Sequence, residues 1–315
     1  MSEAALRICS LPKKHDFAGS CDNQMGQPDA RLGWVWKGIY SQTTNQGGRP
    51  IDFAFDEHHD RVRAPGESED PGRPTILLVG ESIVAGHGLT WDESLPGRIG
   101  AALGVQVVTL GVDGYGSNQA FVRLFDALPR FSHVLAIVTL FFPGLVDRVG
   151  WVDRPRLAFE GDQPMVSPPQ PGLWRDLRIV RLAGDLFPYR DEASIELTSA
   201  IFRQTARLAR SVGARALFLT PRLGQRRPRG DSYLIEELLV RQGLDVVDPD
   251  WQYEELGHGD NHPTAAATRT LAAAVVTALQ RGSSVDSAYG VGVDQSHDHS
   301  SLPPAAGRQR QLVVP

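Results

Sequence analysis

The sequence has only two cysteines, Cys9 and Cys21, among its 315 residues. A secreted scaffold held by disulfides would contain more, so we expect a reducing, cytoplasmic setting, with a single Cys9–Cys21 bridge as the alternative. There is no apolar run of about 18 residues, and no transmembrane helix is therefore predicted. The N-terminal stretch 1–14 also lacks the basic-then-apolar order of a signal peptide.

The chain also has no excess of positive charge. A formal net charge of −5 and a pI of about 6.0 give no electrostatic reason to expect binding to nucleic acid or to an anionic membrane. The sequence has no CxxC or HExxH metal-ligand spacing, no Walker A motif and no GxGxxG dinucleotide fingerprint. We therefore expect neither a metal nor a cofactor.

What is present is an ordinary globular composition, with 41% hydrophobic and 22% charged residues. From residue 75 onward, apolar β-branched runs alternate with helical patterns, which indicates a parallel sheet covered on both faces. The economical architecture is a three-layer α/β/α sandwich with a five-stranded parallel sheet. The expected strands lie at 76–80, 105–111, 133–141, 214–221 and 244–248, and the expected helices near 92–103, 117–128, 192–212, 231–242 and 264–281.

Three segments depart from this alternation. Residues 1–72 predict an irregular N-terminal extension, whose aromatic residues either pack on the core or wall a substrate cleft. An insert at 142–190 follows the third strand and contains a predicted hairpin with its turn near Gly161–Asp162, in the position of a lid or pocket wall. We expect residues 282–315 to form a mobile tail, after a helix that Thr264 caps and Gly282 ends.

Ser82 is the first candidate functional residue. It lies in the turn after the strand at 75–79, and open α/β sheets carry their sites at the carboxyl ends of their strands. Ser82 is therefore either a nucleophile or the N-cap of the next helix. The sequence around it lacks the GxSxG spacing of an α/β-hydrolase elbow, which argues against that fold.

His262 is the candidate base for this serine. It precedes the last helix, at the same edge of the sheet, and Asp260 stands two residues before it. Asp260 could accept the Nδ1 proton of His262 and leave Nε2 directed at Ser82. The alternative is a surface histidine within a helix-capping cluster.

A glycine-rich run, LGVDGYGSNQ, follows the second strand at 110–119. Glycines let the backbone approach a ligand and direct N–H groups at it, so this loop could bind an oxyanion together with the N–H of Ser82. The same glycines could instead only permit a tight turn. An arginine-rich loop after the fourth strand could hold a carboxylate or phosphate, or be a solvated basic loop; it contains Arg222, Arg226, Arg227 and Arg229.

Together, GESIVAGHGL, LGVDGYGSNQ and DNHPT resemble the three corresponding blocks of the SGNH (GDSL-type) hydrolase family, over residues 73–281. The resemblance implies a flavodoxin-like fold and a cofactor-free mechanism on esters. Ser82 would be the nucleophile, His262 the general base and then the acid for the leaving group, and Asp260 the group that orients His262. The oxyanion hole would include the amides of Ser82 and Gly114. The partner would be a small-molecule or acylated substrate.

The chain departs from the family pattern at three points. Glu81 replaces the aspartate of the first block, Asp260 stands at minus two instead of minus three, and Pro143–Gly144 occupies the place of an Asn-Asp pair. Because that Asn completes the oxyanion hole in the family, we consider Asn118 its substitute. An acyltransferase using the same serine and a catalytically silent binding protein are the alternatives to an esterase.

Overall fold

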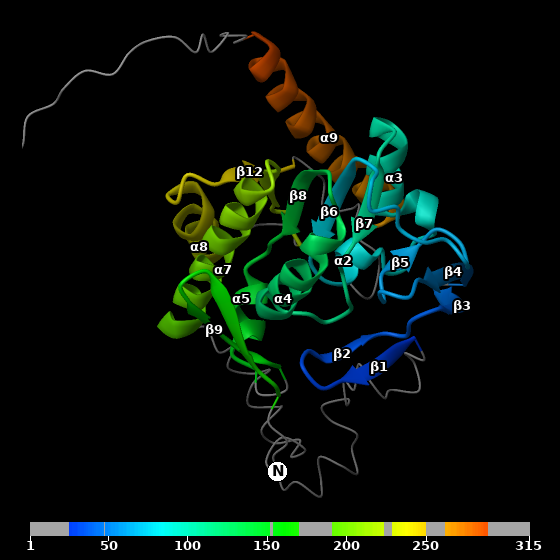
Figure 1. Cartoon of the computed structure of the whole chain (residues 1–315), viewed down its shortest axis with the longest axis horizontal. Coiled ribbons are helices and arrows are strands. Elements are labelled where there is room, and N and C mark those ends of the chain that lie inside the picture. The colour runs from blue at the N-terminus through cyan, green and yellow to red at the C-terminus, as the bar shows by residue number, and fades with distance from the viewer. Residues whose placement is uncertain are drawn as a thin grey trace, which may run out of the picture. The chain divides into compact units, whose positions relative to one another are not determined.

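A computed structural model describes residues 25–46, 48–151, 154–169, 191–223, 229–249 and 262–288 (Figure 1). The chain divides into two compact units, Met1–Leu279 and Gln280–Pro315. The second unit contains the end of the last helix, α9 (Ala265–Ala288), and the first contains everything else that follows. Among the described helices, none combines the length and the apolar character that crossing a membrane requires.

Five parallel strands form the centre of the sheet, as the sequence predicts. They are β6 (Thr75–Val79), β7 (Gln106–Thr109), β8 (Val134–Leu140), β11 (Arg215–Leu219) and β12 (Asp245–Val247), in the spatial order β12-β11-β8-β6-β7. This is the doubly wound order 2-1-3-4-5, in which the connections leave β6 and β8 toward opposite sides. The carboxyl ends of these two strands therefore mark the position where a ligand site is expected.

The sheet has eight strands, so the prediction of a five-stranded parallel sheet is wrong in this respect. Residues from the N-terminal segment add β5 (Arg61–Val62), β4 (Arg49–Phe55) and β3 (Tyr40–Gln46) as an antiparallel extension beside β7. The run from β12 to β3 can be followed in Figure 1. The edge strand β3 is YSQTTNQ, which has no apolar run to detect, because an edge strand does not have to be buried on both faces.

Alternate residues of β6 face opposite layers, which explains its continuous apolar sequence. Ile76 and Leu78 pack in a core with α3 (Leu95–Leu103) and α9. Leu77 and Val79 pack on the other face, against α4 (Ser117–Ala127). A strand buried on both faces cannot show the alternation of polar and apolar residues, and this is the pattern that predicted the three layers.

The remaining helices continue these layers. The third crossover, from β8 to β11, contains α7 (Glu192–Ser211). The Asp191 carboxylate caps this helix by accepting the Ser194 N–H, and the helix packs beside α4 and α5 (Gly144–Val149). Thr264 caps α9 as predicted, but this helix continues past Gly282 to Ala288 because one glycine costs an alanine-rich helix only about 1 kcal/mol. The shorter helical elements are η1 (Trp91–Glu93), η2 (Leu128–Arg130), α8 (Arg229–Ile235) and the π-helical turn η3 (Glu236–Val240).

The insert contains the predicted hairpin. Strands β9 (Arg156–Glu160) and β10 (Gln163–Ser167) pair antiparallel around Gly161–Asp162. Gly161 has a φ of 60°, a left-handed conformation that glycine adopts without strain. The prediction that this insert acts as a lid or pocket wall extends to residues 170–190, which lie outside the described part of the chain.

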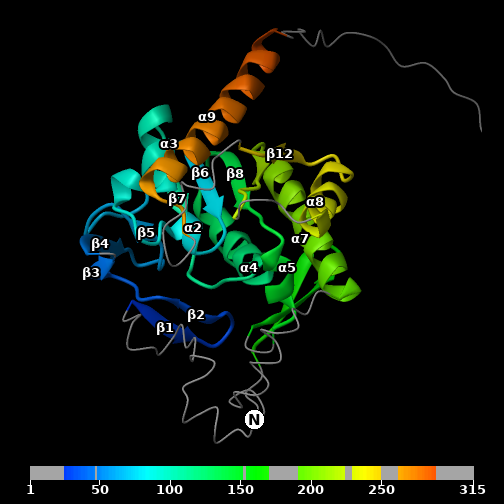
Figure 2. The ribbon, with the colours of Figure 1, turned by 180° about the vertical axis from the view of Figure 1, so that it is seen from behind.

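The N-terminal segment holds the loops at the carboxyl edge of the sheet through their backbone carbonyls. A second hairpin, β1 (Gly26–Asp29) with β2 (Gly33–Trp36), is the dark blue pair of strands in Figure 2. The indole of Trp34 donates to the Asp113 carbonyl and that of Trp36 to the Gly111 carbonyl, each at 2.9 Å. Both rings are buried, so this segment packs on the core.

Arg61 makes the corresponding contact to the loop after β6. Its guanidinium donates at 2.8 Å to each of the carbonyls of Ala85, Gly86 and Leu89, and it lies over the Phe53 ring. Burial lowers the pKa of Arg61 to about 10, and the negative charge of Asp113 acts in the opposite direction. We refer to Trp34, Trp36 and Arg61 as the backbone clamp.

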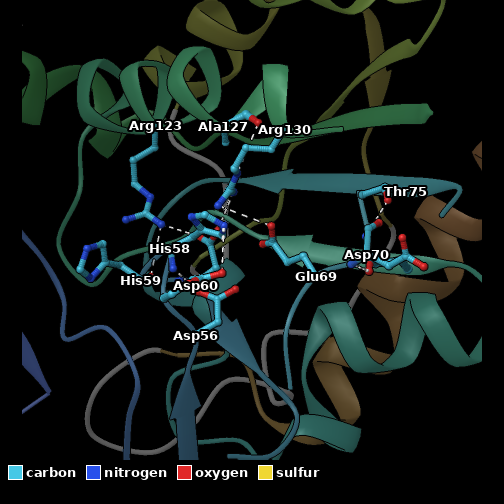
Figure 3. Close-up of polar contacts among 12 residues, drawn as sticks. Asp56, His58, His59, Asp60, Glu69, Asp70, Thr75, Arg123, Ala127 and Arg130 are labelled. Carbon is cyan, nitrogen blue, oxygen red and sulfur yellow. Dashed lines mark hydrogen bonds and ion pairs between the residues drawn. The ribbon is translucent and has the colours of Figure 1, made fainter. Parts of the chain in front are cut away.

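A buried charge cluster joins the same segment to α4 and η2. Arg123 and Arg130 extend toward the carboxylate of Asp60, and Glu69 points into the same group (Figure 3). Burial, together with the neighbouring charge of Asp60, raises the pKa of Glu69 to about 9 against the opposing effect of Arg130. With Glu69 protonated, the two arginines balance Asp60 and the buried Asp56.

The Glu69→Gln variant is expected to resist alkaline destabilisation. The folded state holds the Glu69 proton up to about pH 9, whereas the unfolded chain releases it near 4.5, so stability is lost as the pH rises between these values. Relative to the wild type, the variant should gain about 2–4 kcal/mol between pH 5.5 and pH 8.5 in urea unfolding. The exposed Glu67→Gln is the control, and equal pH dependence of the wild type and Glu69→Gln would contradict the assignment.

Candidate active site

Ser82 is placed by the turn that ends β6. Gly80 allows the turn to fold tightly, because an added Cβ would lie 2.6 Å from the Val84 side chain and 3.0 Å from Leu140. Glu81 caps the following short helix, α2 (Ser82–Ala85), by accepting the Ile83 N–H at 3.0 Å. Ser82 is thus the first residue of a helix that a neighbouring carboxylate caps, and its own side chain is available for another role.

The structure brings His262 to Ser82. The His262 Nε2 and Ser82 Oγ atoms are 2.8 Å apart, although 180 residues separate them in the sequence. This is the hydrogen-bonding geometry of a serine nucleophile and its base. The contact joins the loop after β6 to the segment that enters α9, which is the pairing that the sequence predicts.

The hydroxyl of Ser82 has a second polar partner. It donates to Glu81 Oε2, and the guanidinium Nη1 of Arg148 lies 3.5 Å from the same carboxylate oxygen. A serine hydroxyl has one proton, so in this arrangement the proton faces Glu81, and His262 Nε2 is the donor to Oγ. Removal of the proton by His262 therefore requires the hydroxyl to rotate from Glu81 toward the imidazole, and it requires a neutral His262 whose proton is on Nδ1, so that Nε2 can accept.

The sequence predicts that the backbone N–H groups of Ser82 and Gly114 form an oxyanion site. Among the backbone hydrogen bonds of the described residues, none is donated by the N–H of Ser82 or of Gly114. Gly114 has a φ of 76°, so the loop after β7 needs a glycine at this point. Asn118 contributes elsewhere: it is fully buried in α4, and its Nδ2 donates to the Pro155 carbonyl at 2.7 Å.

Arg148 comes from the segment that follows β8. Pro143 precedes α5, and this helix directs Arg148 toward the nucleophile turn, where its Nη1 also donates to the Tyr115 carbonyl at 3.0 Å. Gly116 leaves room for it, since a Cβ there would lie 3.2 Å from the Arg148 Cβ. The loop that lacks the family's Asn-Asp pair therefore delivers a cation beside Glu81 and Ser82.

A further imidazole and carboxylate lie at the same site. His87 Nδ1 is 3.0 Å from Asp113 Oδ2, and the His87 ring stacks on the His262 ring with 4.5 Å between centroids. His87 follows α2, and Asp113 lies in the glycine-rich loop after β7. The two residues thus come from the same two loops as Ser82 and Gly114.

The other predicted site residues are distributed as follows. Asp260 and Arg226 lie outside the described residues. Arg222 follows β11 and is half-buried. The described structure therefore joins Ser82 and His262 and leaves the triad acid and the arginine loop as sequence-based predictions.

Sequence reasoning gave no role to Arg148, Asp113 or His87. A usable signal existed for the last two, because β6 and β7 are neighbours and polar residues in their following loops must meet at one edge of the sheet. For Arg148 the only signal was its position on the first helical turns after β8, in a stretch where no helix was predicted.

One group of carboxylates in the described structure is close enough to be considered for a metal ion. The ligand atoms of Asp56, Asp60 and Glu69 lie within 4.8 Å of one another. Arg123 and Arg130 already pair with Asp60, so the cluster has its cations from the protein.

No protein-family model matches the chain, and no curated protein matches it. The solved structures that resemble it include a protein named TesA, with 18% identity over 66% of this chain and 98% of that chain and a TM-score of 0.42. A putative lipolytic protein of the G-D-S-L family from Desulfitobacterium hafniense matches with 11% identity over 65% and 98%, at 0.40. The psychrotrophic esterase EstA from Pseudoalteromonas sp. matches with 12% identity over 67% and 98%, at 0.41.

These solved structures include G-D-S-L lipolytic proteins and esterases, which is the family that the three sequence blocks resemble. Their identities and TM-scores are too low to transfer an activity. The chemistry of this chain has to follow from its own side chains.

Proposed function

We propose that the protein is a serine hydrolase of the esterase type, with Ser82 as nucleophile and His262 as its general base. The observation that carries the proposal is the 2.8 Å contact between Ser82 Oγ and His262 Nε2. A helix-capping serine would bond to backbone N–H groups, but here Glu81 does the capping. A histidine that only supports a structural hydroxyl would not need oxyanion donors nearby. This site has two candidate donors, the backbone amides of Ser82 and Gly114.

In the proposed reaction, Ser82 Oγ attacks the acyl carbon of an ester while His262 takes its proton. The amides of Ser82 and Gly114 bind the oxygen that becomes negative. Asp260 orients His262, as the sequence block predicts. Water then hydrolyses the acyl-serine.

Glu81 sets the condition under which Ser82 becomes reactive. Its carboxylate accepts a hydrogen bond from the Ser82 hydroxyl in the structure described, and carboxylates are in general weaker bases than imidazole. A substrate carbonyl arriving at Oγ turns the hydroxyl toward His262. Arg148 neutralises the Glu81 charge, which would otherwise oppose the negative charge that develops on the substrate oxygen.

The Arg148→Met variant is expected to fold and to lose about 10²–10³ in kcat/KM for an ester, the typical cost of one oxyanion-stabilising group. The loss arises because an uncompensated Glu81 carboxylate is then left beside the oxyanion. Hydrolysis kinetics on one ester measure the effect, and the exposed Arg156→Met on β9 is the control. A rate within twofold of the wild type would remove Arg148 from the mechanism.

A fluorophosphonate tests the proposed function directly, because it phosphonylates a serine only when a base activates that serine. We expect one adduct by intact mass, located on the peptide that contains Ser82, and none in Ser82→Ala. An unmodified mass after prolonged exposure of the folded protein would contradict the proposal.

In an assay with an added alcohol, release of free acid would assign hydrolysis, and formation of a new ester would assign transfer.

A further inference from the structure

A second imidazole–carboxylate pair stands against the Ser82–His262 pair. The His87 and His262 rings are 4.5 Å apart between centroids and inclined by 30°, and His87 Nδ1 is 3.0 Å from Asp113 Oδ2. The side chain of Asp113 is 10% exposed and that of His87 29%, so the carboxylate is enclosed and the imidazole borders solvent. His87 therefore lies beside the histidine that contacts Ser82, with part of its ring open to solvent.

The contact with Asp113 fixes which nitrogen of His87 does chemistry. An ionised carboxylate can only accept hydrogen bonds, so the proton between them belongs to His87 Nδ1. The other nitrogen, Nε2, is then the atom that gains or loses a proton. This is the arrangement by which a carboxylate sets the tautomer of a catalytic histidine.

Both members of this second pair are held firmly. Arg61 binds the carbonyls on either side of His87, and Trp34 binds the Asp113 carbonyl. Gly86 and Gly88 have φ values of 74° and 75°, so the loop turns sharply before and after His87. Catalytic side chains require this kind of support from the surrounding structure.

We propose that His87 is a second catalytic acid–base residue, which exchanges protons with the substrate's leaving group and with water, while His262 exchanges the proton of Ser82. This division of roles rests on the proposed function. Asp113 is a positioning residue that holds the Nδ1 proton of His87.

The acylation step begins with a proton on His87 Nε2 and none on His262 Nε2. Ser82 Oγ bonds to the acyl carbon and gives its proton to His262, while the carbonyl electron pair moves onto oxygen. When this pair returns, the bond between the acyl carbon and the alcohol oxygen breaks. The departing oxygen takes the proton of His87, which leaves acyl-serine, protonated His262 and neutral His87.

Deacylation reverses both proton transfers. Water gives one proton to His87 Nε2 as its oxygen bonds to the acyl carbon. The collapse of this second intermediate breaks the bond to Ser82 Oγ, which recovers the proton from His262. The product is a carboxylic acid, and both histidines return to their starting states.

The stacked geometry agrees with this scheme because the two rings share one positive charge in the free enzyme and in the acyl-enzyme, and both are protonated only in the two tetrahedral intermediates, where the substrate oxygen carries a negative charge. Two imidazolium ions with centroids 4.5 Å apart would repel each other. The Asp113 carboxylate offsets the positive charge when that charge is on His87. When the charge is on His262, the carboxylate is still in contact with the neighbouring ring, that of His87.

The test compares two esters of one acyl group in His87→Gln. A p-nitrophenyl ester has a leaving group that needs no proton, and an ethyl ester has one that does. With the first, we expect a p-nitrophenolate burst within about threefold of the wild type, followed by turnover at least about 100-fold slower, since a positioned acid–base group contributes about 10²–10⁴. With the ethyl ester, acyl-enzyme formation itself should fall by about 100-fold.

Hydroxylamine, which attacks acyl-serine with little need for a base, should restore turnover of the p-nitrophenyl ester. Asp113→Asn should show the same pattern with smaller losses, and labelling of Ser82 by a fluorophosphonate at the wild-type rate will show that each variant is folded. An equal fall of burst and turnover on both esters would mean that His87 only supports His262 and would overturn the proposal, as would no change in either. A wild type that forms no acyl-enzyme would overturn the proposed function and this inference together.

Discussion

Ser82→Ala, His262→Gln and the double variant are each expected to lower kcat for ester hydrolysis by about 10⁴–10⁶-fold, and to nearly the same level. The nucleophile and its base act as one unit, joined by the 2.8 Å contact between Oγ and Nε2, so removal of the second adds little once the first is lost. Steady-state kinetics on a p-nitrophenyl ester, with thermal melting of each protein, will measure this.

The exposed His133→Gln is the matched control for the histidine, since it removes an imidazole away from the site. Its rate should equal that of the wild type. Additive losses in the double variant would show that Ser82 and His262 act independently, and normal turnover by Ser82→Ala would exclude a covalent mechanism through this serine.

Arg61→Met is expected to destabilise the fold by about 3–5 kcal/mol. The substitution leaves the carbonyls of Ala85, Gly86 and Leu89 without the guanidinium that binds them, inside a region where water cannot take its place. The remaining folded protein should also have a lower kcat, because these carbonyls belong to the loop that follows Ser82. Urea unfolding measures the first effect and kinetics below the transition the second.

Arg63→Met provides the comparison, because this arginine lies two residues further along and is exposed, and its guanidinium contacts the exposed carboxylate of Asp92. Its effect on stability should be below about 0.5 kcal/mol. If Arg61→Met and Arg63→Met unfolded at the same urea concentration, the hydrogen bonds from Arg61 to the loop would contribute nothing to the stability of the fold.

The parallel core could be predicted because each of its strands has a recognisable apolar pattern in the local sequence. β6 and β8 are buried on both faces and are therefore apolar except for Thr75 and Thr139. The strands β3 and β5 could not be found in this way: β3 is polar, and β5 has two residues, one of them the buried Arg61. Their place in the sheet depends on pairing with β4 and β7, which no local pattern contains.

The candidate active site could also be predicted only in part. Ser82 and His262 could be paired from the sequence because each follows a core strand, and parallel strands bring their carboxyl ends to one edge. Arg148 could not, since its approach to Glu81 depends on the direction of α5, which begins at the Pro143–Gly144 step, and in the sequence this step indicated only a replacement of the Asn-Asp pair. The sequence marks Glu81 as a replacement for the aspartate of the first block, but its bond to the Ser82 hydroxyl follows from side-chain geometry alone.

The side-chain hydrogen bonds of the backbone clamp go to main-chain oxygens: Trp34 and Trp36 bind the loop after β7, and Arg61 binds the loop after β6. Because these bonds recognise no side chain, the loop positions other than the proposed site residues and Tyr115, which packs on Trp34, can exchange side chains over generations while the loops keep their shape. Changes of substrate preference could then accumulate beside Ser82 without a matching change elsewhere. The same property makes these two loops favourable places for combinatorial libraries in directed evolution, with residues 33–36 and 61 held constant.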